Sequence, residues 1–174
     1  VLVIQVMLIM VSAATRLSLY EEAYGLTTLR LYSHAFIFWL VIIFCLMLYK
    51  IYIDNKENSF AVRGFASIVL FLAAMNFLNP DAFIARRNIE RYEAAGKLDI
   101  YYLNGLSDDA IPETIKVLDI SDEELRNNFA RELYNRVQKY DSQHFSKWQS
   151  LNLSRMRAEK ILKSKLSQRY FIYQ

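Results

Sequence analysis

The longest apolar run of the chain, Ala35–Ile53, most narrowly restricts what the chain can fold into. It is uninterrupted except for one charged residue, Lys50. An α-helix of this length extends about 28 Å, close to the hydrocarbon thickness of a bilayer. Trp39 near one end, and Tyr49 and Tyr52 near the other, suit the aromatic belts at the two membrane surfaces. Lys50 can reach the headgroups with its long side chain. The run therefore predicts a membrane-spanning helix.

Two further apolar segments, residues 1–14 and 60–78, predict additional spans. The first is short for a span and starts directly at Val1, so we expect a truncated helix in a chain that is part of a longer protein with more N-terminal spans. The last reaches full length only if Phe60–Gly64 is included and Arg63 extends to the headgroups. Its alanine and serine residues permit close packing against neighbouring membrane helices.

The segment between the first two spans, residues 16–34, alternates leucine and tyrosine with polar residues. This amphipathic composition predicts a segment at the membrane surface. Arg30 and His34 are four residues apart and would share one helix face. Ionisable groups at such a place can mark a substrate or ion path, although simple anchoring at the interface is the favoured interpretation.

Charged residues become frequent after Leu78, and residues 79–174 predict a soluble helical tail. Pro80 suits a first helical position and Gly96 a helix end, which predicts a helix over 80–95. A short helix follows over 98–106, and Ser107 is expected to cap the next one. The fold class is therefore all-α, with about three transmembrane helices, the first truncated, followed by a small soluble helical domain.

The second half of the tail carries one strong amphipathic pattern and one basic pattern. Ser121 and Glu124 form the S-x-x-E capping box. The helix expected after it has a stripe of apolar residues that should face the core: Leu125, Phe129, Leu133, Val137 and Tyr140. Ser154 is expected to cap a final basic helix. A basic helix can bind nucleic acid or anionic lipid, but a solvated face is favoured, so we expect no nucleic-acid partner.

Four separated motifs carry a family resemblance: YGLTTLR (Tyr24–Arg30), LNPDAFIARRNIERY (Leu78–Tyr92), GKLDIYYLNGLSDDAIP (Gly96–Pro112) and KWQSLNLSRMRAEKIL (Lys147–Leu162). In this order, after membrane spans, they resemble the C-terminal portion of the bacterial membrane family described as domain of unknown function 4173, with its relative 4153. The resemblance implies a multi-spanning bacterial membrane protein. It implies no catalytic residue, because the family has no established activity.

Motifs for nucleotide or acyl chemistry are missing from the sequence. It contains no G-x-x-x-x-G-K-[ST], G-x-G-x-x-G or G-x-S-x-G pattern, and its two histidines are far apart. We therefore expect no metal site and no cofactor. Asp99, Asp108 and Asp109 lie around two tyrosines, where acid–base work or sugar binding is one interpretation, but acids at the start of a helix are the favoured one.

The remaining candidate contacts lie in the tail. Arg86, Arg87 and Arg91 follow the last span closely, where they could hold lipid phosphates or simply orient the span. Trp148, Asn152 and Arg155 could form a recognition face, although a tryptophan at helical spacing more often packs in a core.

Two functional hypotheses of different classes remain. The first is a non-enzymatic protein of the bacterial inner membrane whose tail packs on, or recruits, a partner; an envelope protein, the bilayer and the protein's own N-terminal spans are the expected contacts. The alternative is a transporter or envelope enzyme whose working site lies in further spans. Lys50, Lys56 and Arg63 against Arg16 and Arg30 slightly favour an extracytoplasmic tail.

Overall fold

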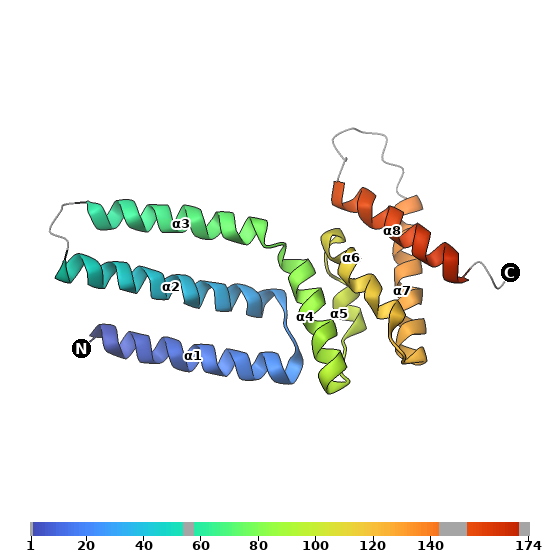
Figure 1. The fold of residues 1–174 in the computed structure, drawn as a ribbon, viewed down its shortest axis with the longest axis horizontal. Coiled ribbons are helices and arrows are strands. Elements are labelled where there is room, and N and C mark those ends of the chain that lie inside the picture. Colours follow the sequence, from blue (N-terminus) through green and yellow to red (C-terminus); the bar gives the residue numbers. More distant parts are fainter. Residues whose placement is uncertain (1, 54–57, 143–152, 171–174) are drawn as a thin grey trace. The chain divides into compact units, whose positions relative to one another are not determined.

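Helices form all the regular structure in the described part of the chain. The computed structural model describes residues 2–53, 58–142 and 153–170, and within these ranges no strand occurs (Figure 1). The chain divides into two compact units, Val1–Pro80 and Asp81–Gln174. The expected all-α class, with long apolar helices first and shorter helices after them, is confirmed.

The first unit consists of three long helices, α1 (Leu2–Tyr24), α2 (Thr28–Tyr52) and α3 (Ser59–Phe77). Figure 1 shows them side by side, and α2 contacts both of the others. Their 23, 25 and 19 residues are long and apolar enough to cross a membrane. At 1.5 Å per residue the helices are about 28 to 38 Å long, which matches a bilayer core.

Apolar side chains cover the outside of these helices. Within its most apolar stretch, α1 has 6% of its residues buried. The corresponding stretches of α2 and α3 have no buried residue. Large residues such as Ile9, Phe38 and Leu70 are each more than 60% exposed. A surface of this kind is stable in lipid and not in water. The unit is therefore the membrane part of a membrane protein.

The connection between α1 and α2 differs from the expected surface segment. Residues 16–24 continue α1 and residues 28–34 already belong to α2, so the segment 16–34 is not a separate element. Gly25 stops α1 because it adopts a left-handed conformation, with φ 84°, and its amide donates to the Glu21 carbonyl. Thr27 then caps α2 by accepting from the Arg30 amide at 3.4 Å.

Trp39 joins α2 to α3 within the membrane unit. Its indole nitrogen donates to the Ser67 hydroxyl at 3.3 Å, and Ser67 in turn donates to the Gly64 carbonyl at 2.7 Å. The Trp39 ring stacks on Phe71, with 5.6 Å between the ring centres. A short polar side chain and an adjacent ring thus hold the two helices together where lipid offers no hydrogen bond.

The second unit is a cluster of short and medium helices. After α4 (Pro80–Ala95) come α5 (Ile100–Asn104), the 3₁₀ turn η1 (Asp108–Ala110), α6 (Ile111–Thr114), the 3₁₀ turn η2 (Ile115–Asp119), α7 (Glu123–Ser142) and α8 (Leu153–Tyr170). Helix α7 packs against α5, η2 and α8. Gly96 ends α4 as expected, with φ 67° and its amide donating to the Tyr92 carbonyl.

Nearly every element of the second unit contributes to one core. Phe129 and Leu133 from α7 are fully buried, as the apolar stripe predicts, and Val137 is 8% exposed. Leu125 is only half-buried, and the side chain of Tyr140 lies outside the described part. The other large, fully buried apolar side chains come from the remaining elements: Ile84, Leu103, Ile111, Val117, Leu118 and Leu162.

Three of the expected helix caps are different in the structure. Ser107 makes no capping hydrogen bond with its side chain, and the residues after it form η1, α6 and η2 instead of one helix. Asp122, not Ser121, caps α7 by accepting from the Leu125 amide at 3.0 Å. A carboxylate is the stronger acceptor at this position because it also interacts favourably with the helix dipole. Ser154 lies inside α8.

We expect Leu133→Ala to lower the free energy of unfolding of the tail by about 2–5 kcal/mol, because it removes fully buried methyl groups and leaves a cavity. The measurement is a urea titration of residues 79–174 followed by circular dichroism. The exposed Arg131 on the same helix provides the control, since Arg131→Ala should change stability by no more than about 0.5 kcal/mol. Equal effects of the two substitutions would contradict the core.

Candidate functional site

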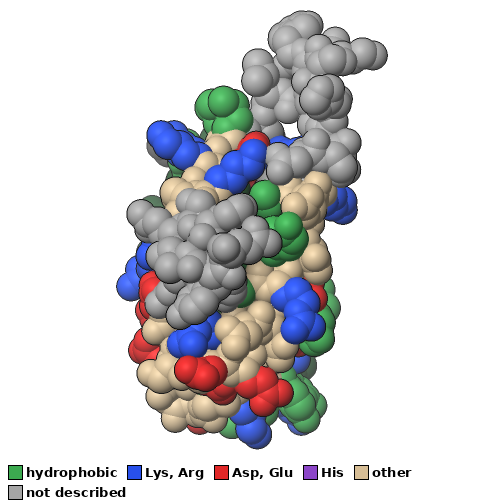
Figure 2. All heavy atoms as spheres, turned by 90° about the vertical axis from the view of Figure 1, so that its right-hand side faces the viewer, with side chains coloured by type: hydrophobic (Ala, Val, Ile, Leu, Met, Phe, Trp, Pro, Cys, Tyr) green, Lys and Arg blue, Asp and Glu red, His purple; other side chains and the backbone are tan. Residues whose placement is uncertain are grey.

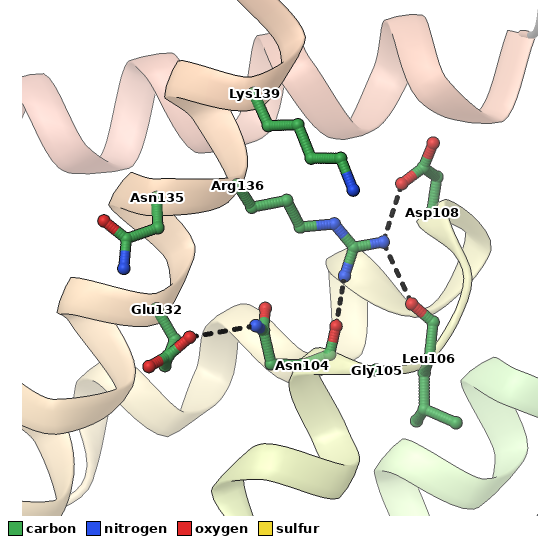
Figure 3. Close-up of a pocket in the computed structure, with 8 residues that line it drawn as sticks. All are labelled: Asn104, Gly105, Leu106, Asp108, Glu132, Asn135, Arg136 and Lys139. Carbon is green, nitrogen blue, oxygen red and sulfur yellow. Dashed lines mark hydrogen bonds and ion pairs between the residues drawn. The ribbon is translucent and has the colours of Figure 1, made fainter.

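A polar pocket of about 580 Å³ lies in the second unit, where the end of α5 meets α7 (Figure 3). Side chains of both charges line it, and they come from three parts of the fold: the end of α5 and the residues after it, η1, and the second half of α7. The lining residues are Asn104, Gly105, Leu106, Asp108, Glu132, Asn135, Arg136 and Lys139.

Arg136 occupies the centre of this pocket and makes three hydrogen bonds. Its guanidinium donates to the carbonyls of Asn104 at 2.8 Å and Leu106 at 2.9 Å, and to the Asp108 carboxylate at 2.7 Å. Helix α5 ends at Asn104, so this carbonyl lacks a partner within its own helix. Arg136 therefore closes the end of α5 and fixes the chain that leads into η1 (Figure 3).

Burial strengthens this arrangement. The side chains of Arg136 and Asp108 are only 15% and 20% exposed, and charge-assisted hydrogen bonds are strong at such sites. Asn104 also donates from its side chain to Glu132 at 3.3 Å, which adds a second link between α5 and α7. The Asn104 Oδ1 atom is buried, and no hydrogen-bond donor in the described residues reaches it.

The three acids that suggested acid–base work have separate structural roles. Asp99 caps α5 by accepting from the Tyr102 amide at 2.9 Å. Asp108 pairs with Arg136, and Asp109 is exposed in the first turn of η1. The favoured interpretation of acids at a helix start therefore fits Asp99, whereas Asp108 pairs with an arginine of α7. Among the described residues, no group of three or more His, Cys, Asp or Glu side chains is placed to hold a metal ion.

Arg30 and His34 lie together at the junction of α1 and α2. Arg30 donates to the Gly25 carbonyl, and its guanidinium lies 5.7 Å from the centre of the Tyr24 ring. The His34 ring is 3.4 Å from the Ser18 hydroxyl through Nε2 and 3.1 Å from the Arg30 carbonyl through Nδ1. Both side chains therefore connect the end of α1 with the start of α2.

The arginines that follow the last span lie on α4 and are not equivalent. Arg86 and Arg87 are exposed and share one carboxylate, Glu90, at 2.9 and 3.6 Å. The hydrogen bond from Arg86 holds the pKa of Glu90 below its ordinary value, and the charges of both arginines act in the same direction. Arg91 is half-buried.

The proposed recognition face falls mostly outside the described part of the chain. Trp148 and Asn152 are not among the described residues, whereas Arg155 is a half-buried residue of α8. The structure therefore gives no geometry for this face.

Sequence reasoning did not identify Arg136 or Asn104. Arg136 lies in a helix rich in alternating charges, where most such residues are solvated. Its role depends on carbonyls located 30 and 32 positions earlier in the chain, and no local pattern reports such a contact. The position of Arg136, three residues after the buried Leu133, indicates only that it lies near the core face of the helix.

Comparison with protein families identifies the family of this chain. The family model described as "Domain of unknown function (DUF4153)" matches residues 1–117. This family is the relative, 4153, of the family that the four sequence motifs resemble. Three of the motifs fall within the matched residues. The fourth, Lys147–Leu162, lies beyond them. No curated protein and no solved structure matches the chain.

We expect Arg136→Met to lower the free energy of unfolding of the tail by about 2–4 kcal/mol, because it removes three hydrogen bonds and leaves the Asp108 carboxylate without its guanidinium. Arg131→Met, on the exposed side of the same helix, is the control and should change stability by no more than about 0.5 kcal/mol. Urea titration of residues 79–174 measures both. A loss for Arg136→Met as small as that of the control would show that Arg136 does not hold α5.

Proposed function

This chain belongs to the DUF4153 family, and from that premise we propose that it is a non-enzymatic, multi-pass protein of the bacterial inner membrane whose helical tail recruits an envelope protein. The observation that carries this proposal is a pair of exposed tyrosines on the tail. Tyr101 on α5 is 74% exposed and Tyr134 on α7 is 52% exposed. Exposed tyrosine is a frequent anchor of protein interfaces.

The two tyrosines are carried by a rigid part of the tail. Helices α5 and α7 pack against each other, and Arg136 and the Asn104–Glu132 hydrogen bond join them. Tyr134 also accepts a hydrogen bond from the Gln138 side chain at 2.9 Å, which restricts its ring. Aromatic side chains held in this way lose little conformational entropy when a partner binds.

The polar pocket supports a non-enzymatic role for the tail. Arg136 and Asp108 would be its natural groups for binding or proton transfer, but their hydrogen bonds close the end of α5. A catalytic group that also holds the fold together could not change its charge state or partners without destabilising the tail.

A photo-crosslinking amino acid at position 101 or 134 of the full chain tests the proposal in cells. p-Benzoylphenylalanine replaces one aromatic ring by another, so the partner should still bind. Because both tyrosines are proposed to contact that partner, we expect the same discrete adduct from both positions. Tyr134→Ala should weaken the adduct formed from position 101. Position 160, exposed on α8, is the matched control and should give none.

The absence of an adduct from positions 101 and 134, or the same adduct from position 160, would overturn the recruitment proposal. Either result would favour the alternative of a transporter or envelope enzyme whose working site lies among further spans.

The same proposal places the tail on the extracytoplasmic side. Lys50 in the last turn of α2 and Arg63 near the start of α3 lie at the opposite end of the helices from Arg30. The Arg63 guanidinium lies 4.8 Å from the centre of the Tyr49 ring, which keeps its charge at this end of the hairpin. Basic residues in short loops favour the cytoplasmic side, whereas long domains cross largely regardless of charge.

An introduced cysteine tests this orientation. With Cys45 replaced by Ala, the exposed Asn128 on α7 is changed to Cys, and cells with a permeable outer envelope receive a membrane-impermeant thiol reagent. Labelling in intact cells is expected. Labelling only after lysis would place the tail inside, and its partners would then be cytosolic.

A further inference from the structure

The exposed face of α4 changes in character along the helix. Its buried side carries Ile84, Ala85, Asn88 and Ile89. The opposite side begins with an exposed ring, Phe83, continues with the two exposed arginines 86 and 87, and ends with the acids 90 and 93. The order from the first turn onward is therefore apolar, then basic, then acidic.

Chain connectivity keeps the first turn of α4 close to the membrane. Membrane helix α3 ends at Phe77 and α4 begins at Pro80. Three residues reach at most about 10 Å even when fully extended. Phe77 and Leu78 are 89% and 60% exposed, as expected for residues at the edge of a bilayer. The start of α4 must therefore lie within reach of the lipid headgroups at that end of α3.

We propose that the outer face of α4, formed by Phe83, Arg86 and Arg87, binds the headgroups of anionic phospholipids. Phe83 enters the boundary between the headgroups and the acyl chains, and the two guanidiniums bind lipid phosphates. Residues 83–87 follow Pro80 within about two helical turns, or about 10 Å. The ring and both guanidiniums therefore stay within reach of the headgroup layer. Guanidinium groups suit this task because they bind phosphate through two parallel hydrogen bonds.

Charge complementarity selects this occupant. The two exposed guanidiniums lie in the half of this face that follows α3 most closely along the chain, whereas the acids 90 and 93 lie in its later half. Glu90 also competes with lipid phosphate for both arginines. Because Glu90 competes in this way, its removal should strengthen lipid binding. Removal of an acid that only stabilises the helix would not have this effect.

The inference depends on the membrane assignment but not on the recruitment of an envelope protein. Loss of lipid binding and loss of the cross-linked adduct are therefore separate results.

Native mass spectrometry of the full chain in detergent, titrated with phosphatidylglycerol or with phosphatidylcholine of the same acyl chains, tests the proposal. We expect preferential binding of phosphatidylglycerol. Arg86→Gln and Arg87→Gln should each lower that preference by about fivefold. Glu90→Gln should raise it. Phe83→Ala should weaken the binding of both lipids equally, because Phe83 contacts the acyl boundary and not the phosphate.

The matched control removes two exposed positive charges elsewhere in the tail, with Arg131→Gln on α7 and Lys160→Gln on α8. It should leave the preference unchanged, which separates a local site from the overall charge of the protein. Three results would each overturn the proposal: no preference in the unmodified chain, an equal loss in the control, or a lowered preference in Glu90→Gln.

Discussion

The bilayer imposes the constraint on which the rest of the structure depends, because every backbone amide and carbonyl in it must find a partner within the protein. Three continuous helices satisfy this requirement. The α1–α2 connection also does so, since Gly25 donates to the preceding turn and Thr27 accepts from the next one. Where α2 meets α3, Trp39 and Ser67 pair with each other. At these two places, polar atoms of the membrane unit are paired where its helices end or touch.

The tail meets a different constraint, since it must build a core from short helices. Arg136 completes the end of α5. The Gly105 and Leu106 amides donate to the three carbonyls of residues 101–103, and the Arg136 guanidinium donates to that of Asn104, the last residue of the helix. The family match ends at residue 117, within η2. The core does not end there, because Phe129 and Leu133 from α7 and Leu162 from α8 are fully buried in the same unit. The smallest folded tail therefore extends beyond the matched residues and includes α7 and α8.

Sequence patterns located long elements well and short ones poorly. The apolar run after Thr28 predicts a helix, because its signal is repeated over several turns. Pro80 and Gly96 predict the start and the end of another helix, because each acts on the local backbone. The structure contains both helices. The caps predicted at Ser107 and Ser121 are wrong. Asp122 accepts from the Leu125 amide at the start of α7, and the Ser107 side chain makes no capping hydrogen bond. The polar residues of segment 16–34 predict a separate segment at the membrane surface. In the structure these residues belong to α1 and α2, and the break between the two helices lies at Gly25 and Thr27.

The sequence by itself determined that this is an all-α membrane protein, because hydrophobic length and charge density along the chain report directly on solvation by lipid or water. It also placed three arginines, 86, 87 and 91, directly after the last span. Only the tertiary structure decided which polar residues act together. Arg136 meets the end of α5, and His34 meets Ser18, across separations of 32 and 16 residues. Such contacts depend on how helices pack, and packing joins residues that no local spacing connects.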